Sequence, residues 1–435
     1  MLSNDQSFDE RSRASSELSS KHPESLIKKG DFTLMDSSDW EARYKNYNAL
    51  MEVAPLYYDQ MMNAWVASRY EDVSTLSRDN RLDLNRIIPD KVASLPEDVA
   101  IALKPITDFV STWMIYNQDP VHIDLKRPMG RTFAKHNMES VLPMIEEITR
   151  EVCHQIKREH QTGEFDFIKD FAHPIPAIIL GSMLGVPKEE IPRFLGWSDQ
   201  LAAFMQNFVV SSIPDQRLAA ATTSTIEEIK IYFEKAVRSR QKAGSQDVLG
   251  DVVNHTNLAV ETIRNQCIHL MFGGHKVPEF LAGTMMYNLG IRPSLLNEVK
   301  GNRDLINSTA NEAIRYDSPI QFITRAANEP LKIRGTDIKE GDAVLLLLGS
   351  ANRDKRVFEN PESFDIHRPH NKHLGFGAGS HVCLGMPLVT IEIKGMFNAL
   401  FDEFPNIRLA NPDSVPAWSD NPTFHGLRHL KVRFD

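Results

Sequence analysis

Cysteine is scarce in this sequence, and its distribution excludes a disulfide-stabilised scaffold. The 435 residues contain 3 cysteines, Cys153, Cys267 and Cys383, which lie far apart and form no CxxC pair. An odd and widely spaced set of cysteines does not build a disulfide framework. We therefore expect the reducing environment of the cytoplasm.

A surplus of positive charge and a long apolar run are also missing. The net charge of -9 leaves no basic excess to neutralise the phosphates of a nucleic acid. The most apolar run, residues 174–187, is too short to cross a membrane. Residues 1–30 are polar and serine-rich without the apolar centre of a signal peptide, and we expect them to be mobile. The pattern predicts a soluble protein with neither nucleic acid nor membrane as a partner.

Helical periodicity dominates what is present. Apolar residues follow helical spacing in residues 138–160, 165–184, 189–205 and 222–243. Strands are expected at the start of residues 65–79, which continue as a helix, in residues 342–352 and in the C-terminal "HLKVRFD". No repeat or linker interrupts the chain. We predict one large domain, residues 31–435, that is mainly α with a small β portion.

The last cysteine lies in a glycine-rich loop, "FGAGSHVCLG". The glycines around Cys383 permit unusual backbone angles and the close approach of another group. Helix-like spacing follows in residues 384–404, with Pro387 acceptable in a first turn. A thiolate beside a helix N-terminus and amide N–H groups is a good iron ligand. From this loop alone, iron ligation and a buried free cysteine both remain open, whereas a zinc site with His381 lacks a second pair of ligands.

This loop and several other segments resemble the cytochrome P450 family. "FGAGSHVCLG" fits the signature FGxGx(H/R)xCxG at every specified position. "NEAIR" supplies the ExxR pair, Glu312 and Arg315, and "FENPESFDIHR" supplies the downstream Arg368. "LGVP" followed by "WSD", then "ANRD", and "DPVHIDLKR" are similar to segments of the soluble bacterial members. The resemblance covers about residues 40–435.

The resemblance implies a cytochrome P450 fold in which haem b lies between distal and proximal helices, with Cys383 as the proximal iron ligand. The cofactor-binding residues implied in this way are His122, Lys126, Arg325, Phe376, Gly377, His381 and Gly385. The four basic ones would neutralise the haem propionates. Lys126 replaces the usual arginine, so a point charge replaces a two-point contact. Glu312, Arg315 and Arg368 would form a buried structural triad behind the loop.

The distal side departs from the family pattern. Residues 261–290 resemble the long distal helix, which we expect to kink at Pro278. The family usually has AGx(D/E)T here, and this chain has Gly273 followed by its candidate catalytic residues, Gly274, His275, Lys276 and Val277. The two glycines would let dioxygen and substrate approach. Lys276 stands at the acid position and Val277 at the threonine position, so the hydroxyl of the usual proton relay is absent.

Three interpretations of this departure remain open. Ordinary monooxygenation persists if water, His275 or the substrate supplies protons. Peroxide-driven, coupling or rearranging chemistry becomes an alternative if Lys276 pairs with an anionic substrate. In the third, Lys276 bonds to a neighbouring carboxylate and has no role in the chemistry.

Taken together, the resemblance implies a bacterial haem-thiolate monooxygenase that oxidises a small, largely apolar metabolite, in specialised metabolism by analogy. The pocket would include Phe204, Phe208, Phe322 and Phe424. Ferredoxin and ferredoxin reductase would supply electrons, and the cysteine face would dock the ferredoxin through Arg127, Arg131, Lys372 and Lys394. A non-catalytic haem sensor is the remote alternative.

Overall fold

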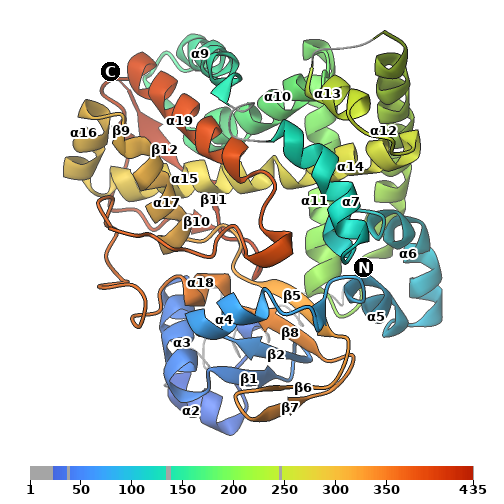
Figure 1. The fold of residues 1–435 in the computed structure, drawn as a ribbon. Coiled ribbons are helices and arrows are strands. Elements are labelled where there is room, and N and C mark those ends of the chain that lie inside the picture. Colours follow the sequence, from blue (N-terminus) through green and yellow to red (C-terminus); the bar gives the residue numbers. More distant parts are fainter. Residues whose placement is uncertain (1–22, 37–39, 134–138, 244–246, 435) are drawn as a thin grey trace, which may run out of the picture.

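The structure, a computed structural model, describes residues 23–36, 40–133, 139–243 and 247–434, and helices make up most of it (Figure 1). In chain order the helices are α2 (Pro23–Lys29), α3 (Trp40–Val53), α4 (Tyr70–Leu76), α5 (Ile87–Ala93), α6 (Glu97–Val110), α7 (Val121–Thr132), α9 (Leu142–Glu159), α10 (Pro174–Met183), α11 (Ile191–Val210), α12 (Gln216–Ala243), α13 (Val248–Asn254), α14 (Val260–Gly273), α15 (Lys276–Gly290), α16 (Pro293–Gly301), α17 (Leu305–Tyr316), α18 (Leu348–Ala351) and α19 (Met386–Glu403). The prediction of a mainly α fold with a small β portion is confirmed.

The strands form small sheets at the edges of the helical body. They are β1 (Leu56–Asp59), β2 (Ala64–Ala67), β3 (Leu82–Asp83), β4 (Glu164–Asp166), β5 (Ile323–Ala327), β6 (Leu331–Ile333), β7 (Thr336–Ile338), β8 (Ala343–Leu346), β9 (Arg408–Leu409), β10 (Ala417–Trp418), β11 (Leu427–His429) and β12 (Lys431–Arg433). The main sheet has the order β1-β2-β8-β5-β3. Figure 1 shows its blue N-terminal strands beside its orange later strands, so this sheet joins distant parts of the chain.

The structure describes only the last part of the N-terminal segment, residues 23–30. Residues 1–22 lie outside the described residues, so the predicted mobility is not tested there. Residues 23–29 form α2, and Leu26 and Ile27 are buried in a core cluster with residues of α3 and the main sheet. These two packed side chains attach α2 to α3 and the main sheet, and the mobility of the N-terminal segment stays a prediction.

Three other predicted segments differ in detail. Residues 165–184 begin in β4, continue as the π-helical turn Phe167–Ala172 and reach α10 only at Pro174. Residues 342–352 contain β8 and then the short helix α18. The C-terminal run is divided between β11 and β12. The other predicted helices and the strand-to-helix segment 65–79 are confirmed, since α9, α11, α12, β2 and α4 occupy them.

The predicted distal helix is interrupted. α14 ends at Gly273 and α15 begins at Lys276, with Gly274 and His275 between them. Pro278 lies in the first turn of α15, where its missing N–H costs no helical bond. The predicted kink at Pro278 is therefore wrong in position. The break lies on its N-terminal side, since a proline cannot bond to the carbonyl group four residues earlier.

The helix after the cysteine loop belongs to the core. Among the described residues, the stretch Gly379–Glu403 is long and apolar enough to span a membrane, but half of it is buried inside the protein. α19 packs against α9 and α17, and its residues Ile393, Phe397 and Leu400 lie in the main core cluster. The apolar character of α19 is explained by this packing, which also fixes the cysteine loop to the helical body.

Candidate cofactor site and its distal face

The cysteine loop has the backbone geometry that its glycines suggested. Gly377 and Gly379 adopt φ angles of +70° and +76°, a region that favours glycine. The Cys383 N–H donates to the carbonyl oxygen of Phe376 at 2.8 Å, which closes the loop. Gly385 is the N-cap of α19. The thiol therefore lies directly before the N-terminus of a helix, as the sequence predicted.

Cys383 differs from the other two cysteines in its surroundings. It is exposed, whereas Cys153 and Cys267 are buried. Although the residue is exposed, desolvation of its sulfur by the surrounding protein raises the pKa of the Cys383 thiol, and hydrogen bonds from the backbone N–H groups of Gly385 and Met386 act in the opposite direction. Cys383 thus combines accessibility with donors that stabilise a thiolate, which are the properties of a metal-ligating cysteine.

Basic side chains gather beside the loop. The His122 and His381 rings stack at 3.9 Å, and Lys126 Nζ donates to two loop carbonyl groups. Arg325 on β5 is 4% exposed. Burial lowers the pKa of His381 to about 3, and the charged groups that add to this effect, His122, Arg325 and Lys126, are all basic. A dicarboxylate ligand would supply the missing counter-charge, so this set fits the propionates of a haem.

The two glycines of the distal segment face different surroundings. Gly273 is exposed, and a methyl group built on it would meet no atom within 4 Å. A methyl group on Gly274 would come within 2.8 Å of the Leu180 side chain. Gly273 therefore borders an open space, while Gly274 allows close helix packing. Only the first fits the expected approach of dioxygen and substrate.

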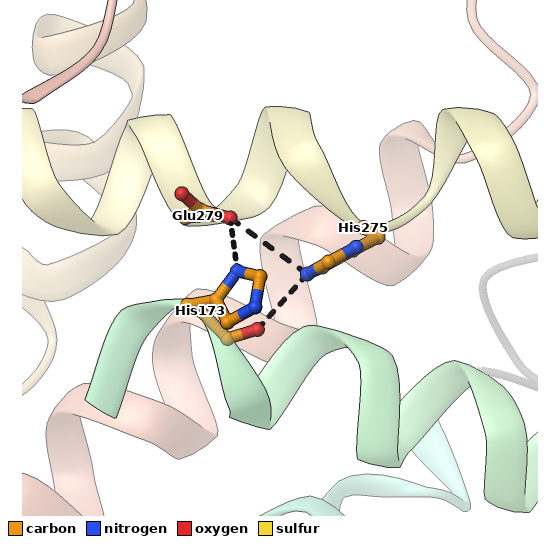
Figure 2. Close-up of side chains that lie close together, drawn as sticks. All are labelled: His173, His275 and Glu279. Atoms are coloured by element: carbon orange, nitrogen blue, oxygen red, sulfur yellow. Dashed lines mark hydrogen bonds and ion pairs between the residues drawn. The ribbon is translucent and has the colours of Figure 1, made fainter. Parts of the chain in front are cut away.

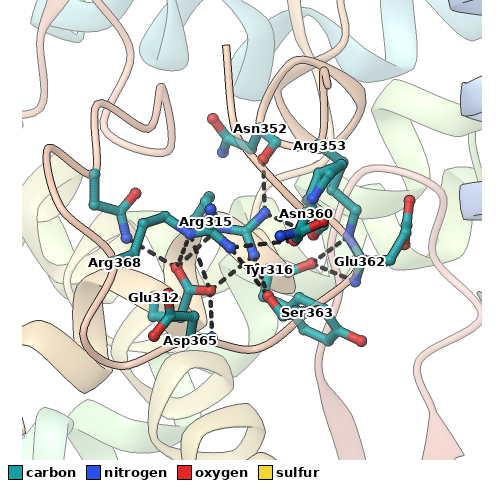
Figure 3. A network of polar contacts seen from close by, with 12 residues as sticks. Glu312, Arg315, Tyr316, Asn352, Arg353, Asn360, Glu362, Ser363, Asp365 and Arg368 are labelled. Carbon is teal, nitrogen blue, oxygen red and sulfur yellow. Dashed lines mark hydrogen bonds and ion pairs between the residues drawn. The ribbon is translucent and has the colours of Figure 1, made fainter. Parts of the chain in front are cut away.

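The predicted triad is brought together behind the loop (Figure 3). Arg315 donates two hydrogen bonds of 2.8 Å to the carboxylate of Glu312, and both side chains are 0% exposed. Arg368 Nε lies 3.2 Å from the same carboxylate. Because Glu312 is enclosed by two guanidinium groups, its buried charge is compensated.

Sequence reasoning missed the rest of this network. The backbone N–H of Asp365 and the side-chain amide of Asn371 also donate to Glu312. Arg315 donates to the carbonyl groups of Asn352, Pro361 and Ser363. Asn352 lies in the "ANRD" segment, which the sequence singles out as family-like. The carbonyl partners could not be predicted, because a backbone group leaves no pattern in the sequence. The network ties α17 to the chain that leads into the cysteine loop.

A second charged cluster lies at the start of α15 (Figure 2). His173 Nδ1 lies 2.8 Å from Glu279 Oε2, and Lys276 Nζ lies 3.1 Å from the same oxygen. Lys276 also pairs with Asp199 at 2.9 Å. Burial acts to lower the pKa of Lys276, but Glu279 and Asp199 raise it above its ordinary value. Lys276 is thus a paired cation, which agrees with the third interpretation.

His275 is a core histidine with both ring nitrogens occupied. Nε2 lies 3.0 Å from the carbonyl oxygen of His173, and Nδ1 lies 3.0 Å from Ser198 Oγ. Burial lowers the pKa of His275 to about 4, so the ring is neutral near pH 7. A neutral and fully hydrogen-bonded ring is poorly suited to donate protons to the substrate.

The same cluster could be taken for a metal site. His173, His275 and Glu279 each place a ligand atom within 4.8 Å of the others. However, the ammonium group of Lys276 already lies beside this carboxylate and beside His173. A divalent cation there would be repelled by it at short range. We therefore interpret the cluster as an ion-pair network.

A cavity of about 330 Å³ adjoins this cluster, and Asp199, Lys276 and Glu279 are part of its wall. Its other wall residues come from α11, α15, the Phe167–Ala172 turn and the β10–β11 hairpin, and they include neither Cys383 nor Gly273. Lys276 therefore lines a cavity whose wall does not include Gly273.

The structure separates the four predicted pocket phenylalanines. Phe204 and Phe208 stack at 5.9 Å within the cluster that contains Met271 of α14. Phe424 lies 6.1 Å from the Phe280 ring. Phe322 is buried in the core cluster formed with α2, α3 and the main sheet. Its contacts there are with core residues, and its assignment to the pocket stays a prediction.

The predicted docking residues lie on the surface. Arg127, Arg131 and Lys372 are exposed and Lys394 is half-buried. Arg127 and Arg131 belong to α7, which Lys126 fastens to the cysteine loop. Their role in docking stays a prediction.

Comparisons with known proteins agree with this geometry. The family described as "Cytochrome P450" matches residues 107–416. The chain is 28% identical to the biotin biosynthesis cytochrome P450 of Bacillus subtilis, over 90% of this chain and 96% of that protein. It is 30% identical to the polyketide biosynthesis cytochrome P450 PksS of the same organism, over 85% and 88%. The solved structure of P450BioI with hexadec-9Z-enoic acid ligated acyl carrier protein matches with a TM-score of 0.81 at 27% identity, over 91% of this chain and 99% of that one.

Proposed function

The chain belongs to the cytochrome P450 family, whose members bind haem through a cysteine thiolate, and from this premise we propose that it is a monooxygenase of a small, largely apolar metabolite in bacterial specialised metabolism. The observation that carries the proposal is the pairing of an accessible, amide-bonded Cys383 with a ring of basic groups. Relatives in biotin and polyketide biosynthesis support the metabolic setting.

The residues around the loop would hold the cofactor. Cys383 would ligate the iron, and the Gly385 and Met386 amides would moderate the basicity of its thiolate. His122, Lys126, Arg325 and His381 would bind the propionates. Phe376 and Gly377 would shape the loop that carries Cys383. Bound haem supplies the activation of dioxygen, which side chains cannot provide.

The distal residues would leave room for the substrate and would not themselves supply protons. Gly273 leaves room for substrate, while Val277 presents no hydroxyl group. Lys276 is held by two carboxylates, and His275 is neutral and fully bonded. These contacts leave water and the polar groups of the substrate as proton sources. The same lack of a hydroxyl favours peroxide-driven turnover as the second candidate.

One experiment tests the enzyme class and separates these candidates. Purified ferrous protein is treated with carbon monoxide, and we expect the absorption band typical of thiolate-ligated haem, absent in Cys383→Ser. Substrate oxidation is then compared with ferredoxin, ferredoxin reductase and NADPH, or with hydrogen peroxide. Faster turnover with ferredoxin supports the monooxygenase. Turnover with peroxide alone supports the alternative, and a wild type without the thiolate band contradicts both.

A second experiment tests Lys276 as a substrate anchor. Apolar acids and their amides are titrated into ferric wild type and Lys276→Met, and the spin-state change is recorded. Because Lys276 is paired and lines a cavity whose wall does not include Gly273, we expect acids and amides to bind alike in both proteins. An acid preference that is lost in the variant would make Lys276 a carboxylate anchor instead. Free and carrier-bound acyl chains belong in the panel, since a relative was solved with a carrier protein.

A further inference from the structure

The loop between α6 and α7 is fixed to α14 by side-chain amides. Gln266 Nε2 donates to the carbonyl oxygen of Thr112 at 2.9 Å, and Gln266 Oε1 accepts from the Met114 N–H at 2.8 Å. Asn265 Nδ2 donates to Thr112 Oγ1 at 3.0 Å. Asn265 and Gln266 are both buried. These bonds hold the intervening residue, Trp113, in one place against α14.

Trp113 lies flat on a histidine of that helix. The Trp113 and His269 rings stack with centroids 5.1 Å apart and an interplanar angle of 19°. Phe272, which is also on α14, has its ring centroid 5.3 Å from that of Trp113. The Phe109 ring contacts the Trp113 ring edge-on, with centroids 6.0 Å apart. The aromatic contacts fix both rings, so their polar atoms have defined directions.

Both rings carry a buried polar atom without a partner. Trp113 Nε1 and His269 Nδ1 make no hydrogen bond with any residue that the structure describes. Trp113 is 0% exposed. Buried polar atoms are nearly always hydrogen-bonded, and leaving one unpaired is costly. Two such atoms on stacked rings therefore call for a partner outside the chain.

His269 lies on the same helix as the exposed Gly273. His269 lies four residues before Gly273, so both are on one face of α14. Gly273 is exposed to the open space, and His269 keeps part of its surface accessible despite its interior position. On the other side, the charge of His122, which stacks on His381 of the loop, acts on the pKa of His269.

We propose that Trp113 and His269 form a hydrogen-bonding anchor that selects substrates carrying a neutral oxygen, a hydroxyl or a carbonyl group. The inference rests on the proposed function, because it takes the space beside Gly273 as the substrate site. The indole N–H is a donor, and a neutral imidazole offers one donor and one acceptor. Together they suit a carbonyl or hydroxyl oxygen.

The charge state of His269 decides between a neutral and an anionic group. Burial lowers the pKa of His269 to about 4, and the nearby His122 adds to this effect. The imidazole is therefore uncharged near pH 7 and offers a carboxylate no ion pair. Binding a neutral oxygen satisfies both rings, whereas a pure hydrocarbon leaves them unpaired.

The test uses the ferric holoenzyme and ligands that share one carbon skeleton: decalin, decalol and decalone. We expect the two oxygenated ligands to bind wild type roughly tenfold more tightly than decalin, as a satisfied pair of hydrogen bonds would give. His269→Leu and Trp113→Phe should each reduce this preference to less than about threefold. His269→Gln, which keeps a donor and an acceptor, should retain part of it.

Matched controls separate this inference from packing and from the proposed function. Phe272→Leu removes an aromatic contact but no polar atom, so it should lower the affinity for all three ligands alike. Wild type that binds the three ligands alike, or none of them, overturns the anchor. A ferric spectrum of nitrogen-ligated iron that disappears in His269→Leu also overturns it, as does haem loss confined to the His269 variants. Absence of the carbon monoxide band of thiolate-ligated haem in every protein instead refutes the proposed function.

Discussion

The network behind the cysteine loop and the cluster at the start of α15 both pair carboxylates with cations inside the protein, but they differ in how deeply the charges are buried. Glu312 and Arg315 are 0% exposed and share two hydrogen bonds. In the other cluster Glu279 is 7%, Lys276 21% and Asp199 43% exposed in their side chains. The first is a rigid, fully buried pair, and the second is a graded chain of charges that reaches a surface cavity.

This difference in burial determines how much stability is lost when one charge of a pair is removed. A buried pair with good geometry contributes little beyond its apolar substitute, but removing one partner leaves an uncompensated charge. Half-exposed partners are solvated by water when a neighbour is lost, so the cost is smaller. The two clusters should therefore respond to single substitutions in a fixed order.

Arg315→Leu should have the largest effect. It leaves the Glu312 carboxylate buried with only Arg368 as a cationic partner, at 3.2 Å. We expect a loss of about 3–5 kcal/mol in the free energy of unfolding, measured by denaturant unfolding. Arg368→Leu is the matched control and should cost less, since it leaves the two short bonds intact. Equal losses in the two variants would contradict this ranking.

Lys276→Met should cost about 1.5–3 kcal/mol, the range for hydrogen bonds to charged groups. Glu279 keeps His173 as a partner, and Asp199 is open to solvent. A double-mutant cycle with Glu279→Gln measures the direct coupling of the pair. No coupling in that cycle would mean that Lys276 acts on Glu279 only weakly, and the contrast between the clusters would sharpen further.

The two clusters also differ in how far the sequence could predict them. The ExxR spacing places Glu312 and Arg315 on one helix face, and the family resemblance adds Arg368, so the first network followed from sequence. In the second, Glu279 follows Lys276 at helical spacing, but His173, in the turn before α10, and Asp199, on α11, lie more than 70 residues earlier. Only the tertiary packing of α10, α11 and α15 brings these residues together, and no local sequence pattern predicts that packing.

The same limit applies to the fold and the substrate side. Periodicity located the long helices, and the glycine loop located Cys383. The break at Gly274 and His275 was missed because the proline that causes it lies after the break. Trp113 and His269 were missed because a tryptophan in a loop and a histidine on a helix give no signal until they stack.

The response to pH should separate the clusters as well, since arginine does not titrate and histidine does. The pKa of His275 is about 4 in the folded protein, below the unfolded value of about 6.5. Between these values the unfolded state binds the proton and the folded state does not. Stability should therefore fall as pH drops from 6.5, by up to about 1.4 kcal/mol per pH unit for this residue. In His275→Gln the slope of unfolding free energy between pH 5 and 6.5 should be shallower by that amount, and an unchanged slope would assign the proton uptake elsewhere.

Arg131→Glu should leave stability nearly unchanged, in contrast to both clusters, because Arg131 is exposed on α7. If the cysteine face docks an acidic ferredoxin, reversing this charge should slow ferredoxin-driven reduction several-fold at low salt, since complementary charge speeds encounter. The effect should shrink as salt screens the surfaces, and substrate binding should stay the same. Arg217→Glu, an exposed charge at the start of α12, is the matched control. Equal reduction rates for Arg131→Glu and wild type at low salt would remove Arg131 from the docking surface.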